Sequence, residues 1–98
     1  MSTATADTTT MRQPAEWMTP ADDRILELIR DRGNLTPKAI SDFGGPTRQY
    51  TSERCAKLAK YGLLEKVHHG LFGITDAGEA YLDEELDASE LEPADDAE

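Results

Sequence analysis

The fold of this chain is decided by residues 47–74, which read TRQYTSERCAKLAKYGLLEKVHHGLFGI. Their first part has the spacing of an amphipathic helix over residues 47–61. At 100° per residue, its narrow apolar arc consists of Thr51, Cys55 and Leu58. The opposite side consists of Gln49, Glu53, Ala56, Lys57 and Lys60. That side is polar, and it is small at Ala56, so we expect the helix to lie close to a partner.

A β-hairpin is predicted directly after this helix, over residues 64–74. Gly62 suits the left-handed position that closes a helix, and the apolar pair Leu63-Leu64 follows it at once. His69-Gly70 lies between two β-prone runs, where we expect a two-residue turn with positive φ.

Further helices are predicted on both sides of this stretch. Residues 20–32 carry a buried stripe at Ile25, Leu26, Leu28 and Ile29. A second helix begins at Pro37, because proline suits the first helical position, and the glycines and proline of residues 44–46 end it. A last helix begins at Asp76. The predicted architecture is mainly α: three helices, a small β-hairpin and a fourth helix.

This order of elements resembles a winged helix-turn-helix domain, in which a recognition helix is followed by a two-stranded wing. Residues 58–64, LAKYGLL, are similar to the helix–wing junction of MarR-like and phage-repressor-like regulators. Residues 74–79, ITDAGE, are similar to the junction after their wing. Together with residues 52–55, SERC, and Tyr81-Leu82, they resemble the halophage-repressor-like proteins of haloarchaea. The resemblance covers residues 17–87.

The resemblance implies a DNA-binding transcriptional regulator that acts as a repressor. The helix 47–61 would enter the major groove, and the 64–74 wing would lie on the flanking groove or backbone. The residue types suit this, because Gln can pair with adenine, Glu accepts from cytosine N4, and Lys reaches guanine or phosphate. The predicted DNA-binding residues are Arg48, Gln49, Tyr50, Ser52, Glu53, Lys57, Lys38, His68 and His69.

Five residues have a second interpretation. Arg54 lies on the flank of the apolar arc, where an intramolecular ion pair or a stacking contact is favoured over base reading. Cys55 falls within the arc, so a buried thiol is favoured over a nucleophile. His68 and His69 are either solvated wing-tip residues or contacts to DNA. Neighbouring strand residues point to opposite faces, which disfavours a shared metal ion. Lys38 is either a backbone contact or an ordinary surface lysine.

The charge of the chain is distributed unevenly. The 98 residues carry a net charge of −10, which by itself argues against a nucleic-acid partner. Residues 20–75, however, carry nine Lys and Arg against seven Asp and Glu, a net charge of +2. Residues 76–98 carry eleven acids and no base. This asymmetry is typical of a protein with a DNA-facing side and a solvated back.

The length permits one domain. We expect a disordered leader, a winged helix domain and an acidic disordered tail, over residues 1–16, 17–87 and 88–98. One recognition helix reads few base pairs, so a homodimer on two half-sites is expected. Its candidate surfaces contain Trp17, Tyr81 and Leu82.

Three functional classes remain. The first is the DNA-binding regulator, without a cofactor, a metal or a small-molecule substrate. The second is a winged-helix protein-interaction module that does not bind DNA, which the net charge of −10 suits. The third and least supported is a small redox or metal enzyme. No apolar run approaches the roughly 20 residues of a membrane span, and the single cysteine is consistent with a cytoplasmic location.

Overall fold

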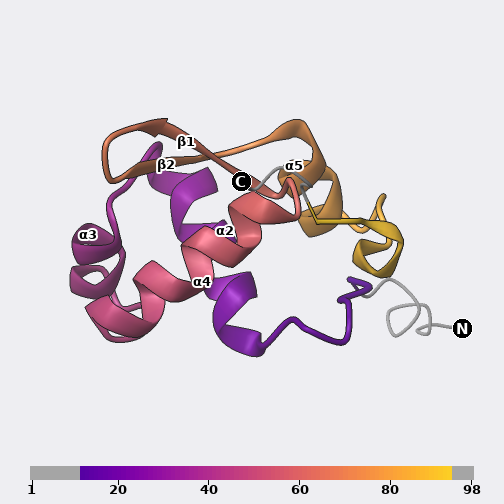
Figure 1. The fold of residues 1–98 in the computed structure, drawn as a ribbon, viewed down its shortest axis with the longest axis horizontal. Coiled ribbons are helices and arrows are strands. Elements are labelled where there is room, and N and C mark those ends of the chain that lie inside the picture. The colour runs from indigo at the N-terminus through magenta and orange to yellow at the C-terminus, as the bar shows by residue number, and fades with distance from the viewer. Residues whose placement is uncertain (1–11, 94–98) are drawn as a thin grey trace, which may run out of the picture.

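The computed structural model describes residues 12–93. In chain order, their elements are α2 (Pro20–Arg32), α3 (Pro37–Asp42), α4 (Arg48–Lys60), β1 (Leu64–His68), β2 (Leu71–Ile74), α5 (Asp76–Leu82) and the 3-10 turn η1 (Ala88–Glu90). The hairpin of β1 and β2 runs along one edge of the molecule, from the α3 side to the α5 side (Figure 1). Helices α3 and α4 form the helix-turn-helix. This order confirms the predicted winged helix-turn-helix fold.

Threonine side chains begin three of the helices. The hydroxyls of Thr36, Thr47 and Thr75 accept hydrogen bonds from the backbone N–H three residues further on, at 3.1, 3.3 and 3.0 Å. Such caps satisfy backbone donors that lack a partner within the helix. The starts of α3, α4 and α5 are therefore specified locally by the sequence.

The wing has a two-residue loop, as predicted, but only one of its two residues has the expected positive φ. Gly70 has a φ of +74°, whereas His69 has a negative φ. The register shifts by one residue between Lys66 and His68, so β1 contains a bulge next to the loop. A bulge with a left-handed glycine joins two strands without a second positive φ.

A third strand of one residue adds to the hairpin. Leu35 exchanges two backbone hydrogen bonds with Phe72 of β2, at 3.0 and 2.9 Å. The bridge is antiparallel and lies directly before α3. It fixes the start of the helix-turn-helix to the wing, and no pattern in the sequence indicated it.

The core is organised around α2, which contacts α3, α4, α5 and β2. The fully buried side chains of the core include Ile25, Leu26, Ile29, Ile40, Leu58, Leu63 and Tyr81. Helix α5 approaches the start of the wing so closely that a Cβ at Gly78 would lie 2.3 Å from the Leu63 carbonyl oxygen. A glycine is therefore required at that position.

Chain segments on both sides of the expected domain also pack against it. Ala15 and Ala88 are buried, and the N–H of Ala88 donates to the Gln13 carbonyl at 2.9 Å. These packed residues lie outside the 17–87 range. A single alanine can be buried without belonging to a periodic apolar pattern, so the sequence did not indicate that Ala15 and Ala88 are buried. The rest of the expected leader and tail, residues 1–11 and 94–98, lies outside the described residues.

Candidate nucleic-acid interface

Helix α4 has one buried face and one exposed face. Thr51, Cys55 and Leu58 have no exposed surface, which confirms the predicted helical phase. The outer face of α4 consists of Arg48, Gln49, Tyr50, Ser52, Glu53, Ala56 and Lys60, all of which are exposed. The face offers amide, hydroxyl, carboxylate and cationic groups around one small residue.

A buried ion pair attaches α4 to α2. Arg54 donates two hydrogen bonds to the carboxylate of Asp22, at 2.8 and 2.6 Å. It also donates to the Trp17 carbonyl oxygen at 2.9 Å. The hydrogen bond with the fully buried Asp22 raises the pKa of Arg54 above its usual value. This confirms that Arg54 makes an intramolecular ion pair.

The indole of Trp17 covers the same flank of α4. It stacks on Tyr61 with ring centroids 4.1 Å apart and an interplanar angle of 22°. The ammonium of Lys57 lies 5.8 Å from the Trp17 ring centroid, and the guanidinium carbon of Arg54 lies 5.9 Å from it. The helical angle predicted Lys57 on the outer face, but it is half-buried on this flank, whereas Gln49, Glu53, Ala56 and Lys60 are exposed as predicted.

A hollow of about 420 Å³ lies where the helix-turn-helix meets the wing loop. Three predicted site residues, Lys38, Arg48 and Ser52, line it beside Gly70. Lys38 pairs with Asp42 at 2.9 Å, but both side chains are more than half exposed. An exposed pair contributes only about 0–1 kcal/mol, so the ammonium can exchange Asp42 for another anion.

The wing exposes most of its first strand. His68 and His69 are exposed, and so is Lys66, a cation that the sequence analysis did not assign to the interface. Its place on the predicted wing, two residues before His68, was the available signal. Within residues 12–93, no group of three His, Cys, Asp or Glu side chains is arranged to hold a metal ion.

Two residues predicted for a dimer surface lie in the core instead. Tyr81 is fully buried, and Leu82 is 3% exposed. The Tyr81 hydroxyl donates to Asp23 at 2.7 Å, and burial together with this carboxylate raises the pKa of Tyr81. Both of these apolar residues of α5 are therefore covered within the chain. Trp17 keeps a partly exposed ring beside Tyr61.

The chemistry of Cys55 is that of a buried apolar group. Burial, and secondarily the charge of Asp22, raises the pKa of its thiol to about 12. The thiol is therefore protonated at neutral pH, when only the thiolate would be an effective nucleophile. This agrees with the interpretation of Cys55 as a core residue.

Comparisons with known proteins agree with this fold. The family model described as winged helix-turn-helix phage repressor matches residues 11–94. The repressor protein of Halobacterium phage phiH is 38% identical over 89 residues, which cover 86% of this chain and 100% of that protein. The crystal structure of the PhiH1 repressor-like protein from Haloarcula marismortui matches with a TM-score of 0.79 and 42% identity. That match covers 86% of this chain and 98% of the other.

In the part of the chain that the structure describes, no helix is long and apolar enough to cross a membrane.

Proposed function

This chain belongs to the winged helix-turn-helix phage repressor family, and on that basis we propose that it binds double-stranded DNA and represses transcription. Helix α4 enters the major groove, and the hairpin of β1 and β2 lies on the flanking groove or backbone. Bound at a promoter, the domain blocks access of the transcription machinery by occupying the site. This action needs no cofactor, no metal and no catalytic group.

The observation that carries the proposal is the outer face of α4. A B-form major groove is about 12 Å wide and admits one α-helix. The face presents Gln49, Ser52 and Glu53, whose side chains can pair with base edges. Ala56 keeps the centre of the face low, so the helix axis can approach the bases. The opposite face is anchored by the core and by the Asp22–Arg54 pair.

The hollow beside the wing supports a position for the DNA backbone. Arg48 and Lys38 reach it from α4 and α3, and the Ser52 hydroxyl adds a neutral donor. Cations and hydroxyls at the edge of a groove fix the register of a protein on the duplex by binding phosphate oxygens. His68, His69 and Lys66 extend the contact along the wing.

We propose further that two copies bind two half-sites. A single α4 contacts too few base pairs for useful specificity, and a symmetric dimer doubles the number of base pairs that are read. Tyr81 and Leu82 are buried. Of the three residues predicted for the dimer surface, Trp17 is therefore the one that remains partly exposed.

The net charge of −10 favours one competing function, a protein-interaction module without DNA binding. A titration of duplex DNA separates the two. Genomic fragments retained by the tagged protein supply the candidate sites, and fluorescence anisotropy then measures affinity for a labelled duplex.

The decisive variant is Gln49→Ala, matched with Asp31→Asn on an exposed position of α2. We expect Gln49→Ala to weaken binding by about 1–3 kcal/mol, the value of a good base contact. Asp31→Asn should bind like the wild type, and both variants should keep the wild-type melting temperature. Retention of no specific fragment by the wild type, or equal affinity of both variants, would favour the interaction module.

A further inference from the structure

We propose that Trp17 is a positioning residue for DNA binding, which holds Lys57 and the flank of α4 in the geometry that binds DNA. The inference rests on the proposed DNA-binding function. It assigns a part in that function to the segment before α2, which lies outside the helix-turn-helix. Trp17 precedes α2, and its ring lies against Tyr61, Arg54 and Lys57. It acts through the residues that it contacts.

The contacts of Trp17 follow one side of α4. Its indole meets Lys57 and Tyr61, and its carbonyl accepts from Arg54. Positions 54, 57 and 61 are three and four residues apart, so they are neighbours along one flank of the helix. The flank lies between the buried arc and the outer face. Trp17 therefore supports α4 over two turns, at the border of the surface that meets DNA.

The Trp17 ring restricts the side chain of Lys57. An ammonium within about 6 Å of an indole centroid is attracted by the ring, and the lysine stem can pack along it. Lys57 is half-buried for this reason, whereas Lys60, three residues further on, is exposed. A lysine that is already ordered loses less side-chain entropy when it binds a phosphate. Trp17 thus lowers the entropic cost of one DNA contact.

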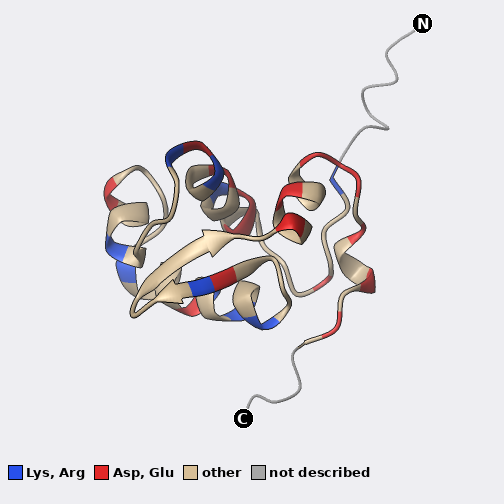
Figure 2. Cartoon of the chain, turned by 90° about the horizontal axis from the view of Figure 1, so that it is seen from above, with Lys and Arg blue, Asp and Glu red and all other residues tan. Residues whose placement is uncertain are grey.

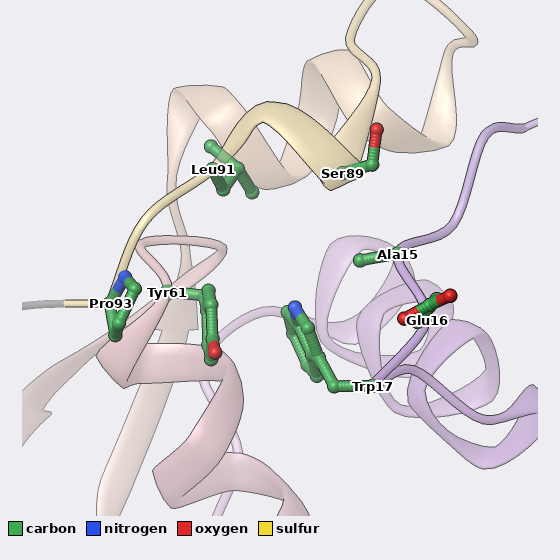
Figure 3. A pocket seen from close by; sticks show the side chains of 7 residues that line it. All are labelled: Ala15, Glu16, Trp17, Tyr61, Ser89, Leu91 and Pro93. Carbon is green, nitrogen blue, oxygen red and sulfur yellow. The ribbon is translucent and has the colours of Figure 1, made fainter.

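Trp17 is itself held from several sides. Its carbonyl is bonded to Arg54, which is paired with Asp22, and Ala15 two residues earlier is buried. Figure 3 shows Trp17 and Tyr61 at the edge of a hollow of about 410 Å³, which Leu91 and Pro93 also line. The ring is therefore fixed on its backbone side and accessible on the other. It can serve as a support without being part of the central core.

A double-mutant cycle on duplex binding tests the coupling between the ring and the lysine. The variants are Trp17→Leu, Lys57→Gln and their combination. A second cycle uses Lys60→Gln in place of Lys57→Gln. Lys60 is the matched control, because it is an exposed lysine of the same helix for which the structure shows no contact with the Trp17 ring within residues 12–93. Trp17→Leu keeps the backbone carbonyl and an apolar side chain, so the bond to Arg54 remains possible.

In the first cycle, we expect each single change to weaken binding, and the double variant to bind no worse than Lys57→Gln alone. The effect of Trp17→Leu should be about two- to twelvefold, the range that corresponds to the entropy lost when one long side chain is ordered on binding. Lys57→Gln should lower the slope of log affinity against log salt by about 0.9, as loss of one phosphate contact does. Trp17→Phe, which keeps a ring, should recover part of the affinity. In the second cycle, the effects should be additive.

A measurement without DNA tests the geometry independently of the function. In proton NMR spectra, the ε-methylene of Lys57 should be shifted upfield by the indole ring relative to that of Lys60, and Trp17→Leu should remove the shift. Absence of the shift in the wild type would overturn the inference whatever the DNA results. If the shift is present but the wild type binds no duplex, the proposed function fails and the positioning role for DNA fails with it. If the wild type binds and the two cycles are equally additive, DNA binding stands and the role of Trp17 is overturned.

Discussion

The cations at the two ends of the molecule are used differently. Around α5 and the start of the described residues, Arg12 pairs with Asp23 and Glu27, and Arg30 pairs with Asp83 at 2.7 Å. On α4 and the wing, by contrast, the structure shows within residues 12–93 no ion pair for Arg48, Lys57, Lys60 or Lys66. Figure 2 shows Asp and Glu gathered on the side that carries both ends of the described chain.

This contrast explains how an acidic chain can present a surface that suits DNA. The eleven acids of residues 76–98 dominate the net charge, and the arginines nearest to them serve in intramolecular pairs. The cations that could bind phosphate lie on other elements. The local distribution of charge, and not the total of −10, governs what the surface attracts. The exception is Arg54, a cation of α4 that is paired internally.

Breaking that exceptional pair should have the largest effect. Asp22→Ala leaves the guanidinium of Arg54 largely buried without its partner, which typically costs about 3–5 kcal/mol of stability. Chemical denaturation measures the loss. The control is Asp31→Ala, an exposed acid of the same helix, for which a change within about 0.5 kcal/mol is expected. Equal effects of the two changes would mean that the pair does not hold α4.

Removing an unpaired cation should affect DNA binding and leave stability unchanged. We expect Arg48→Gln to weaken duplex binding by about 1.5–3 kcal/mol, the value of a hydrogen bond to a charged group. Its salt slope should fall by about 0.9. Arg30→Gln changes the net charge equally at the acidic end, and its slope should equal that of the wild type. A reduced slope in Arg30→Gln would show that net charge, rather than position, controls binding.

The neutral thiol of Cys55, on the buried face of α4, predicts a loss of stability in alkali. The pKa of Cys55 is raised to about 12 in the folded chain, whereas the unfolded thiol titrates near 9.0. Above the unfolded pKa, the unfolded state loses a proton that the folded state retains. Stability should therefore fall between these two values, by at most about 1.4 kcal/mol per pH unit for one proton. Thermal unfolding across this range should show a shallower decline in Cys55→Ala, and an identical decline would assign the effect to other groups such as Tyr81.

The smallest effect is expected for the exposed pair at the acidic end. Arg30→Ala removes the contact with Asp83, whose side chain is 53% exposed, and should cost about 0–1 kcal/mol. The cost should shrink between about 0.1 M and about 1 M KCl, because the Debye length falls from about 10 Å to about 3 Å. A large loss of stability that salt does not reduce would show that this arginine is structural in the same sense as Arg54.

Local patterns in the sequence were sufficient for most of the fold. The arc of Thr51, Cys55 and Leu58 gave the phase of α4, because helical periodicity depends only on neighbours three and four residues away. The apolar stripe of residues 20–32 likewise located α2, and proline at the first helical position located α3. The flank position of Arg54 indicated an internal partner, although not which acid it would be.

Long-range pairing could not be derived in this way. The bridge between Leu35 and Phe72 joins residues far apart in the chain, and one residue has no period that would reveal a strand. The apolar residues of α5 have the same pattern whether a core or a second copy covers them, which is why Tyr81 and Leu82 were misplaced. Asp22 has the sequence signature of an ordinary first-turn acid.

The sequence by itself determined the order of elements, the buried and exposed faces of α4, and the family to which the chain belongs. These features depend on composition and spacing within single segments. Only the tertiary structure decided that Asp22 is the partner of Arg54, that Trp17 lies against Lys57 and Tyr61, and that Ala15 and Ala88, outside the predicted domain, pack on it. The physical reason is that a side chain's charge and shape limit its possible partners, whereas the packing of α2 against α4 selects one of them.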